Sequence, residues 1–445
     1  MSLLVPLAMF GWIPALLILF AAMPSRRAVI VGFLGAWMFL PMAGYPIQGL
    51  PDYTKSTATA LGVLLATAIF DGNRLLTFRF RLIDLPMLAY CTIPVLSALS
   101  AGYGLYEGIS SILNQSFMWG IPYFIGRLFF RDLESLRELA VGIFIGGLVY
   151  MPLCLFEIRM SPQLHNLVYG FHQHDFLQTL RGAGYRPTVF MQHGLAVGTF
   201  MCTAALAGVW LWRSRVIRTL WGIPTAWLAL ALLLTAILCK STGATALMFI
   251  GLGTLFVGQA LGMRWLLLGL ALAPVAYVLF RTVGGWSGSI LVEITRLISD
   301  QRAESLQTRI DSETNLWRLV QPDLFLGSGR FVYAALRGEV GVIPDGMWII
   351  ALGCNGLFGL AAFLGAMVLP SARFARRYAA RYWNHPTLAP AVVLAAVCAL
   401  YMCDCLFNAM INPVLLLALG GLATLVSNPL PRPVPAVARA EAVAA

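Results

Sequence analysis

Charged residues are scarce in this chain: Asp, Glu, Lys and Arg make up 11% of its 445 residues, while hydrophobic residues make up 59%. Soluble domains carry about a quarter charged residues, so this scarcity excludes an ordinary soluble protein. Apolar runs of about 20 residues recur from end to end, and each is long enough to cross a bilayer. The runs are continuous rather than alternating, which excludes an outer-membrane barrel. The sequence therefore predicts an all-α polytopic membrane protein.

The chain also lacks a basic segment before its first apolar run, which begins almost at Met1. We therefore expect a retained first helix rather than a cleaved signal peptide. Nearly all of the 8 cysteines lie inside apolar runs, where they behave as small hydrophobic residues, so no disulfide framework is expected. The "CDC" at Cys403 to Cys405 has no nearby histidine, which disfavours a metal site.

The apolar runs predict about 12–13 membrane helices in a single polytopic domain, residues 1–427. The expected spans are 4–22, 28–43, 57–71, 82–101, 112–130, 139–157, 189–212, 219–239, 242–262, 265–281, 346–369, 388–410 and 411–427. Loops on one side are short and arginine-rich, as in "RLFFRDLESLRE", so that side is expected to be cytoplasmic. The N-terminus then lies outside. The Pro- and Ala-rich tail, 428–445, is expected to be a disordered cytoplasmic segment.

Two long loops, 158–188 and 282–345, fall on the opposite side and are rich in cations. We expect them to form the functional site. The basic residues of interest on this side are Arg181, Arg186, Lys240 in "CKSTG", Arg302, Arg309 and Arg330. The net charge of +11 does not indicate a nucleic-acid partner, because the basic residues are scattered between helices. Guanidinium groups bind phosphate oxygens bidentately, so the pattern favours a diphosphate whose lipid tail lies between helices.

Several of these residues also have an ordinary structural interpretation. Arg302 and Arg309 are seven residues apart, so one face of a helix would present both to an anion. Alternatively, Arg309 pairs with Glu313 and Arg302 is solvated. Asp345 is either the N-cap of the next helix or a carboxylate that accepts a proton from an incoming hydroxyl. His193 is either a hydrogen-bonded packing residue or a second candidate base.

Two further polar groups are ambiguous. The "HQHD" at His172 to Asp175 invites a metal interpretation, but its spacing does not suit a helical zinc site and fixes no third ligand. Asp404 and Asn408 lie in an apolar run, where a buried acid is costly. They indicate either a functional site or a polar contact between helices.

Three stretches resemble the O-antigen ligase and polymerase superfamily, whose members join lipid-carried glycans at the outer face of the bacterial inner membrane. "RGAGYRPTVFMQHGLAVG" is similar to the arginine-glycine segment that enters a helix in this superfamily. "SLQTRIDSETNLWRLVQPDLFLGSGR" resembles its arginine, tryptophan, proline and GxG stretch. "DGMWIIALGCNGLFGL" resembles the segment in which a polar residue opens a helix that continues through GxxGL. Asp345 stands where ligases usually show a His-Asn pair, which favours the polymerases.

The resemblance implies a GT-C-like glycosyltransferase that polymerises undecaprenyl-diphosphate-linked repeat units of O-antigen or exopolysaccharide, with its active site facing the periplasm. It implies metal-independent, inverting transfer without a cofactor. The implied partners of the protein are an undecaprenyl-diphosphate-linked glycan donor, a glycan acceptor and the bilayer. A flippase or a chain-length regulator is a further possible partner. The alternatives are a ligase that transfers the glycan to lipid A core or a protein, and a polysaccharide flippase or transporter. The implied catalytic residues are Asp345, Arg309 and His193, and the implied diphosphate-binding residues are Arg181, Arg186, Arg302, Arg330 and Lys240.

Overall fold

The computed structural model describes residues 2–181, 184–297, 299–329 and 344–428, which are almost entirely helical. The first helices are α1 (Leu4–Ala22), α2 (Ser25–Phe39), α3 (Lys55–Phe70), α4 (Gly72–Leu76), α5 (Leu85–Ser100), α6 (Gly104–Gln115), α7 (Ile121–Phe129), α8 (Leu133–Met160) and α9 (Leu164–Tyr169). They are followed by α10 (Gly194–Arg213), α11 (Thr225–Leu238), α12 (Thr242–Leu261), α13 (Trp265–Thr282), α14 (Ser289–Arg296), α15 (Asp300–Val320), α17 (Met347–Arg377), α18 (Ala389–Asp404) and α19 (Pro413–Ser427).

Short elements connect these helices. A π-helical turn, Ser116–Gly120, joins α6 to α7, and 3-10 turns lie at Leu82–Asp84, Phe176–Thr179, Gln321–Asp323 and Ala380–Tyr382. Strands β1 (Gly44–Tyr45) and β2 (Tyr53–Thr54) form one antiparallel hairpin. Strands β3 (Thr219–Leu220) and β4 (Ile223–Pro224) form another.

Seven of the described helices are long and apolar enough to cross a membrane: α1, α5 with its preceding turn, α8, α10, α12, α13 and α17. Four shorter apolar helices accompany them. Large apolar side chains point outward from the peripheral helices, with Leu7 of α1 and Phe280 of α13 exposed by 68% and 60%. Such surfaces suit lipid rather than water. The chain is an all-α polytopic membrane protein, as predicted, while the count of 12–13 spans and the GT-C arrangement stay predictions.

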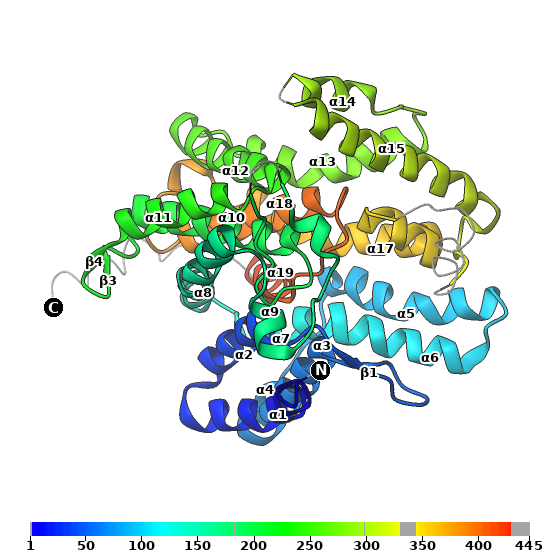
Figure 1. Cartoon of the computed structure of the whole chain (residues 1–445), viewed down its shortest axis with the longest axis horizontal. Helices are drawn as coiled ribbons and strands as arrows, with labels where there is room; N and C mark the ends of the chain where they lie inside the picture. Colours follow the sequence, from blue (N-terminus) through cyan, green and yellow to red (C-terminus); the bar gives the residue numbers. More distant parts are fainter. Residues whose placement is uncertain (1, 182–183, 298, 330–343, 429–445) are drawn as a thin grey trace, which may run out of the picture.

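The centre of the bundle consists of α10, α18 and α19 (Figure 1), whose side chains are buried along most of their length. Glycines allow α7 and α19 to approach closely, because a side chain at Gly126 would collide with the Leu417 carbonyl. A buried ion pair fastens the same region: Arg127 lies 2.6 Å from Asp84 and also donates to Thr424 of α19 at 2.8 Å. These contacts make the centre a rigid support for the helix ends around it.

Several helix boundaries differ from the prediction: the helix expected at 139–157 is α8 (Leu133–Met160), and the helix expected to reach residue 410 is α18, which ends at Asp404. The helix expected from residue 189 begins only at Gly194, because Thr188 and Val189 donate their backbone N–H groups to the buried carboxylate of Glu157. The helix expected to end at 369 continues to Arg377 and is interrupted at Gly356, which has a φ of 63°.

The interruption of α17 is filled by the segment Leu324–Gly329 of the second long loop. Ser328 N–H donates to the Gly353 carbonyl at 3.0 Å, and Leu357 N–H donates to the Leu324 carbonyl at 2.8 Å. These bonds satisfy backbone groups that the bend removes from the helix. The predicted disordered tail falls on residues 429–445, which lie outside the described part of the chain.

Candidate functional site

Arg181 and Arg186 lie at the two ends of a small hairpin just before α10. Leu180 and Tyr185 pair across it, and the Arg181 N–H donates to the Gly184 carbonyl at 2.9 Å. The Arg186 side chain is only 3% exposed. A side chain at Gly194 would collide with the Arg186 stem, so the glycine that opens α10 leaves the room that this arginine occupies.

Lys240 ties this hairpin to the turn between α11 and α12. Its ammonium donates to the Arg181 carbonyl at 3.0 Å, and its own carbonyl accepts a hydrogen bond from Arg186 Nη2 at 3.2 Å. The backbone of Lys240 is left-handed, with a φ of 53°, which is unusual for a residue other than glycine. The turn thus presents the carbonyl and the ammonium of Lys240 to the same hairpin.

Two arginines of α15 complete a cluster of cations. Burial, together with the positive charges of Arg181, Arg302 and Arg309, lowers the pKa of Arg186 to about 10. Burial and the charges of Arg302 and Arg309 also lower the pKa of Arg181. Arg302 and Arg309 therefore lie close enough to the hairpin to repel its guanidinium groups. We define the cation cluster as Arg181, Arg186, Lys240, Arg302 and Arg309.

Arg309 connects the cluster to two carboxylates. Its Nε lies 3.6 Å from Asp345 Oδ2, and its Nη1 donates to Asn408 Oδ1 at 3.2 Å. Asn408 in turn donates to Asp404 at 2.7 Å. Asp345 is not the N-cap of α17, because Gly346 occupies that position. Its side chain is 44% exposed, so it remains accessible to a hydroxyl group beside the cluster.

His193 caps α10 and is held in its neutral form. Leu195 N–H donates to His193 Nδ1 at 3.0 Å, so the proton is on Nε2, which lies 3.3 Å from Gln178 Oε1. Burial, together with the positive charges of His174 and the nearby arginines, lowers the pKa of His193 to about 3. The lone pair that a general base needs is occupied by the helix cap. His193 therefore fits the structural alternative better than the role of a base.

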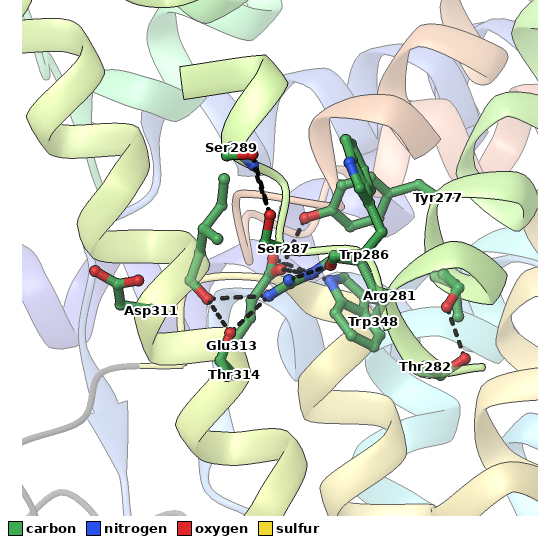
Figure 2. Close-up of polar contacts among 12 residues, drawn as sticks. Tyr277, Arg281, Thr282, Trp286, Ser287, Ser289, Asp311, Glu313, Thr314 and Trp348 are labelled. Atoms are coloured by element: carbon green, nitrogen blue, oxygen red, sulfur yellow. Dashed lines mark hydrogen bonds and ion pairs between the residues drawn. The ribbon is translucent and has the colours of Figure 1, made fainter. Parts of the chain in front are cut away.

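The predicted alternative for Arg309, a pair with Glu313, is wrong. Glu313 instead forms a buried ion pair with Arg281 of α13, with Nε 3.4 Å from Oε2 (Figure 2). Arg309 therefore keeps its positive charge on the side of the cluster.

An apolar pocket between α10, α12 and α18 adjoins the polar groups. It is lined by Thr199, Cys202, Thr203, Leu206, Ala244, Leu247, Met248, Val397, Leu400 and Tyr401. Thr199 Oγ1 donates to Asp404 Oδ2 at 3.4 Å, and Asp404 reaches Arg309 through Asn408. Hydrogen bonds through Thr199, Asp404 and Asn408 thus connect the wall of an apolar pocket to the cation cluster, an arrangement that suits an amphipathic molecule with an anionic head.

Of the predicted site residues, the structure brings together Arg181, Arg186, Lys240, Arg302, Arg309, Asp345 and His193. Arg330 lies outside the described residues. No role was predicted for Glu157, whose carboxylate holds the segment after Arg186, because nothing in the neighbouring sequence distinguishes it from a surface acid. Asp404 and Asn408 could be recognised in the sequence as two polar residues at i, i+4 spacing in an apolar run. Their partners Thr199 and Arg309 could not be predicted.

The "HQHD" segment places the His174 ring against His193, with ring centroids 4.5 Å apart. Within the described ranges, no three His, Cys, Asp or Glu side chains form a group that could hold a metal ion. Comparison with protein-family models and with curated proteins gives no match to this chain. The resemblance to O-antigen ligases and polymerases therefore stays an interpretation of the motifs in 181–198, 305–330 and 345–360.

Proposed function

We propose that this protein polymerises undecaprenyl-diphosphate-linked glycan repeat units at the periplasmic face of the bacterial inner membrane. The observation that carries the proposal is the cation cluster beside an apolar pocket. Five cations gather around two carboxylates, Asp345 and Asp404, so the site has an excess of positive charge before any substrate binds. A lipid diphosphate supplies both the negative charge and the apolar tail that such a site lacks.

The chemistry would be inverting glycosyl transfer. The bond between the anomeric carbon and the diphosphate oxygen breaks, and the departing diphosphate gains negative charge. Arg181, Arg186 and Arg309 stabilise that charge more strongly in the transition state than in the ground state. An acceptor hydroxyl on a second lipid-linked glycan attacks the opposite face of the sugar. Asp345 accepts the hydroxyl proton, and undecaprenyl diphosphate leaves.

The test uses the purified chain in detergent with lipid-linked repeat units and EDTA, with products resolved by size. We expect a ladder of longer lipid-linked glycans that disappears in Arg309→Ala. Transfer of one intact glycan to added lipid A core, without a ladder, would instead identify a ligase. Movement of labelled lipid across a liposome, without transfer to any acceptor, would identify a flippase and sink the enzyme hypothesis.

A further inference from the structure

Glu313 is a buried carboxylate on α15, the helix that carries Arg302 and Arg309 of the cation cluster. It is 3% exposed, and it accepts hydrogen bonds from Tyr277 Oη at 2.8 Å and Trp348 Nε1 at 3.1 Å. Arg281 supplies the opposite charge and extends further, donating to the Ile310 carbonyl and to Thr314 Oγ1, both at 3.0 Å. Figure 2 shows these side chains pointing toward one another from α13, α15 and α17.

Glu313 lies on the same face of α15 as the arginines of the cation cluster. At 3.6 residues per turn, Arg302, Arg309, Glu313, Leu316 and Val320 lie within about 40° of a common line along the helix. Leu316 and Val320 pack with Tyr277, Trp348, Leu352 and Leu360 in a buried apolar cluster. The C-terminal half of α15 is thus docked on α13 and α17, while its N-terminal half carries two arginines to the cation cluster. Glu313 lies where these halves meet.

Glu313 is also a potential competitor for Arg309. The two residues have the i, i+4 spacing at which Arg and Glu side chains pair on a helix. A pair with Glu313 would turn Arg309 away from Asp345 and Asn408 and neutralise its charge. Arg281 prevents this by holding the carboxylate toward α13 and α17, where Tyr277 and Trp348 donate hydrogen bonds to it.

We propose that the Arg281–Glu313 pair positions Arg309: it fixes α15 on α13 and α17, and it withholds the Glu313 carboxylate from Arg309. Both are positioning residues rather than catalytic ones. The inference rests on the proposed function to the extent that Arg309 binds a diphosphate.

The test measures the Kd of inorganic pyrophosphate and the Tm of the full chain in detergent. Arg281→Met frees the Glu313 carboxylate, and we expect about tenfold weaker binding. In the double variant Arg281→Met with Glu313→Gln, the competing charge is gone, the glutamine oxygen still accepts from Trp348, and the glutamine amide can donate to the Tyr277 hydroxyl. Its Kd should return to within about threefold of the wild type.

Arg127→Met is the matched control, because it breaks another buried ion pair, with Asp84, in a region away from α15. It should lower the Tm and leave the Kd within about twofold of the wild type. Equal binding by Arg281→Met and the wild type would overturn the inference. So would a double variant that binds no better than Arg281→Met.

Spin labels test the position of α15 without any ligand. Thr308→Cys on α15 and Leu279→Cys on α13 introduce exposed thiols, whereas the 8 native cysteines are buried or half-buried. We expect one narrow distance in the wild type and a broadened distribution in Arg281→Met. If the wild type does not bind pyrophosphate, the proposed function fails, and the label distance still decides the inference: an unchanged distribution in Arg281→Met contradicts it.

Discussion

The Arg309 guanidinium lies 3.6 Å from the Asp345 carboxylate, where α15 packs against α17. The same arginine donates to Asn408, which lies four residues after the end of α18. The proposed base and the proposed diphosphate-binding group are therefore in direct contact. Proton transfer by Asp345 and anion binding by Arg309 are therefore coupled. The two functions can still be separated experimentally, because one is measured as turnover and the other as binding.

Asp345→Asn should separate them. We expect kcat to fall by about 10²- to 10⁴-fold, the range for the loss of a general base. Pyrophosphate should bind as well as before or more tightly, because a negative charge beside the cation cluster is removed. Turnover on lipid-linked repeat units and the Kd of pyrophosphate check the two parts.

Asp311→Asn is the matched control, because Asp311 lies on α15 with Arg309 and accepts a hydrogen bond from the exposed Gln307 at 2.8 Å; Figure 2 shows it apart from the Arg281 group. It should leave both quantities within about twofold of the wild type. Full turnover in Asp345→Asn would assign the base elsewhere, and Asp404 would be the next residue to test.

Arg186→Met should raise stability while it abolishes function. The lowering of the Arg186 pKa to about 10 corresponds to a cost of about 3 kcal/mol for the charged form. Since the folded pKa of a base is lowered, this cost is fully present below pH 10 and is relieved as the pH rises above 10. Methionine removes the cost and loses one hydrogen bond to the Lys240 carbonyl, worth about 1–2 kcal/mol.

The measurements for Arg186→Met are thermal unfolding at pH 7 without ligand and pyrophosphate binding. We expect a higher Tm, and a Kd about 10- to 100-fold weaker, as for the loss of a charged hydrogen bond. Arg137→Met serves as a control, because Arg137 forms an exposed pair with Glu134 on α8. A lower Tm in Arg186→Met, with binding unchanged, would make this arginine structural.

The positions of the outer helices could be predicted from the sequence, because every lipid-facing backbone must be helical and covered by apolar side chains. The predicted limits of α1, α12 and α13 differ from the observed ones by at most one residue. The start of α10 was missed by five residues. The backbone before α10 is held by hydrogen bonds to Glu157, a residue about 30 positions earlier in the chain. No sequence pattern marks Glu157 as a partner of Thr188.

The cations of the site could also be predicted, because positive charge in outward segments conflicts with the usual orientation rule. Their partners could not. Local spacing assigns Glu313 to Arg309, whereas the fold assigns it to Arg281, a residue of another helix. Asp345 likewise has the local features of an N-cap, but the chain places Gly346 at the cap and turns the carboxylate toward α15. Pairing across helices depends on tertiary packing, which local patterns do not contain.

Acid should destabilise the protein through His193. Its pKa is about 6.5 when unfolded and about 3 when folded, so the unfolded chain binds a proton that the folded chain does not. The contribution of neutral His193 to stability is therefore fully present above pH 6.5 and is lost as the pH falls toward 3, by about 1.4 kcal/mol per pH unit.

Thermal unfolding between pH 7 and pH 5 should show this slope. His193→Asn keeps an N-cap without a titratable group and should flatten it. An identical slope in both proteins would mean that another group titrates.

Filling the apolar pocket should separate lipid binding from diphosphate binding. Leu247 is half-buried in the pocket wall on α12, and Leu247→Trp would occupy space that we assign to the first part of the polyprenyl tail. The cation cluster is untouched, so inorganic pyrophosphate should bind with a Kd within about twofold of the wild type. Undecaprenyl diphosphate should bind at least about tenfold more weakly, since each buried CH₂ contributes about 0.8 kcal/mol.

The control for this variant is Leu261→Trp, which adds the same side chain at a site on α12 that is 61% exposed and lies outside the pocket. Both ligands should bind it normally. If Leu247→Trp binds undecaprenyl diphosphate as well as the control does, the tail follows another path, and the pocket beside Thr199 has no part in donor binding. If both ligands bind Leu247→Trp weakly, the tryptophan has displaced Asp404 and Asn408, and the Arg309–Asn408 hydrogen bond is the contact to examine next.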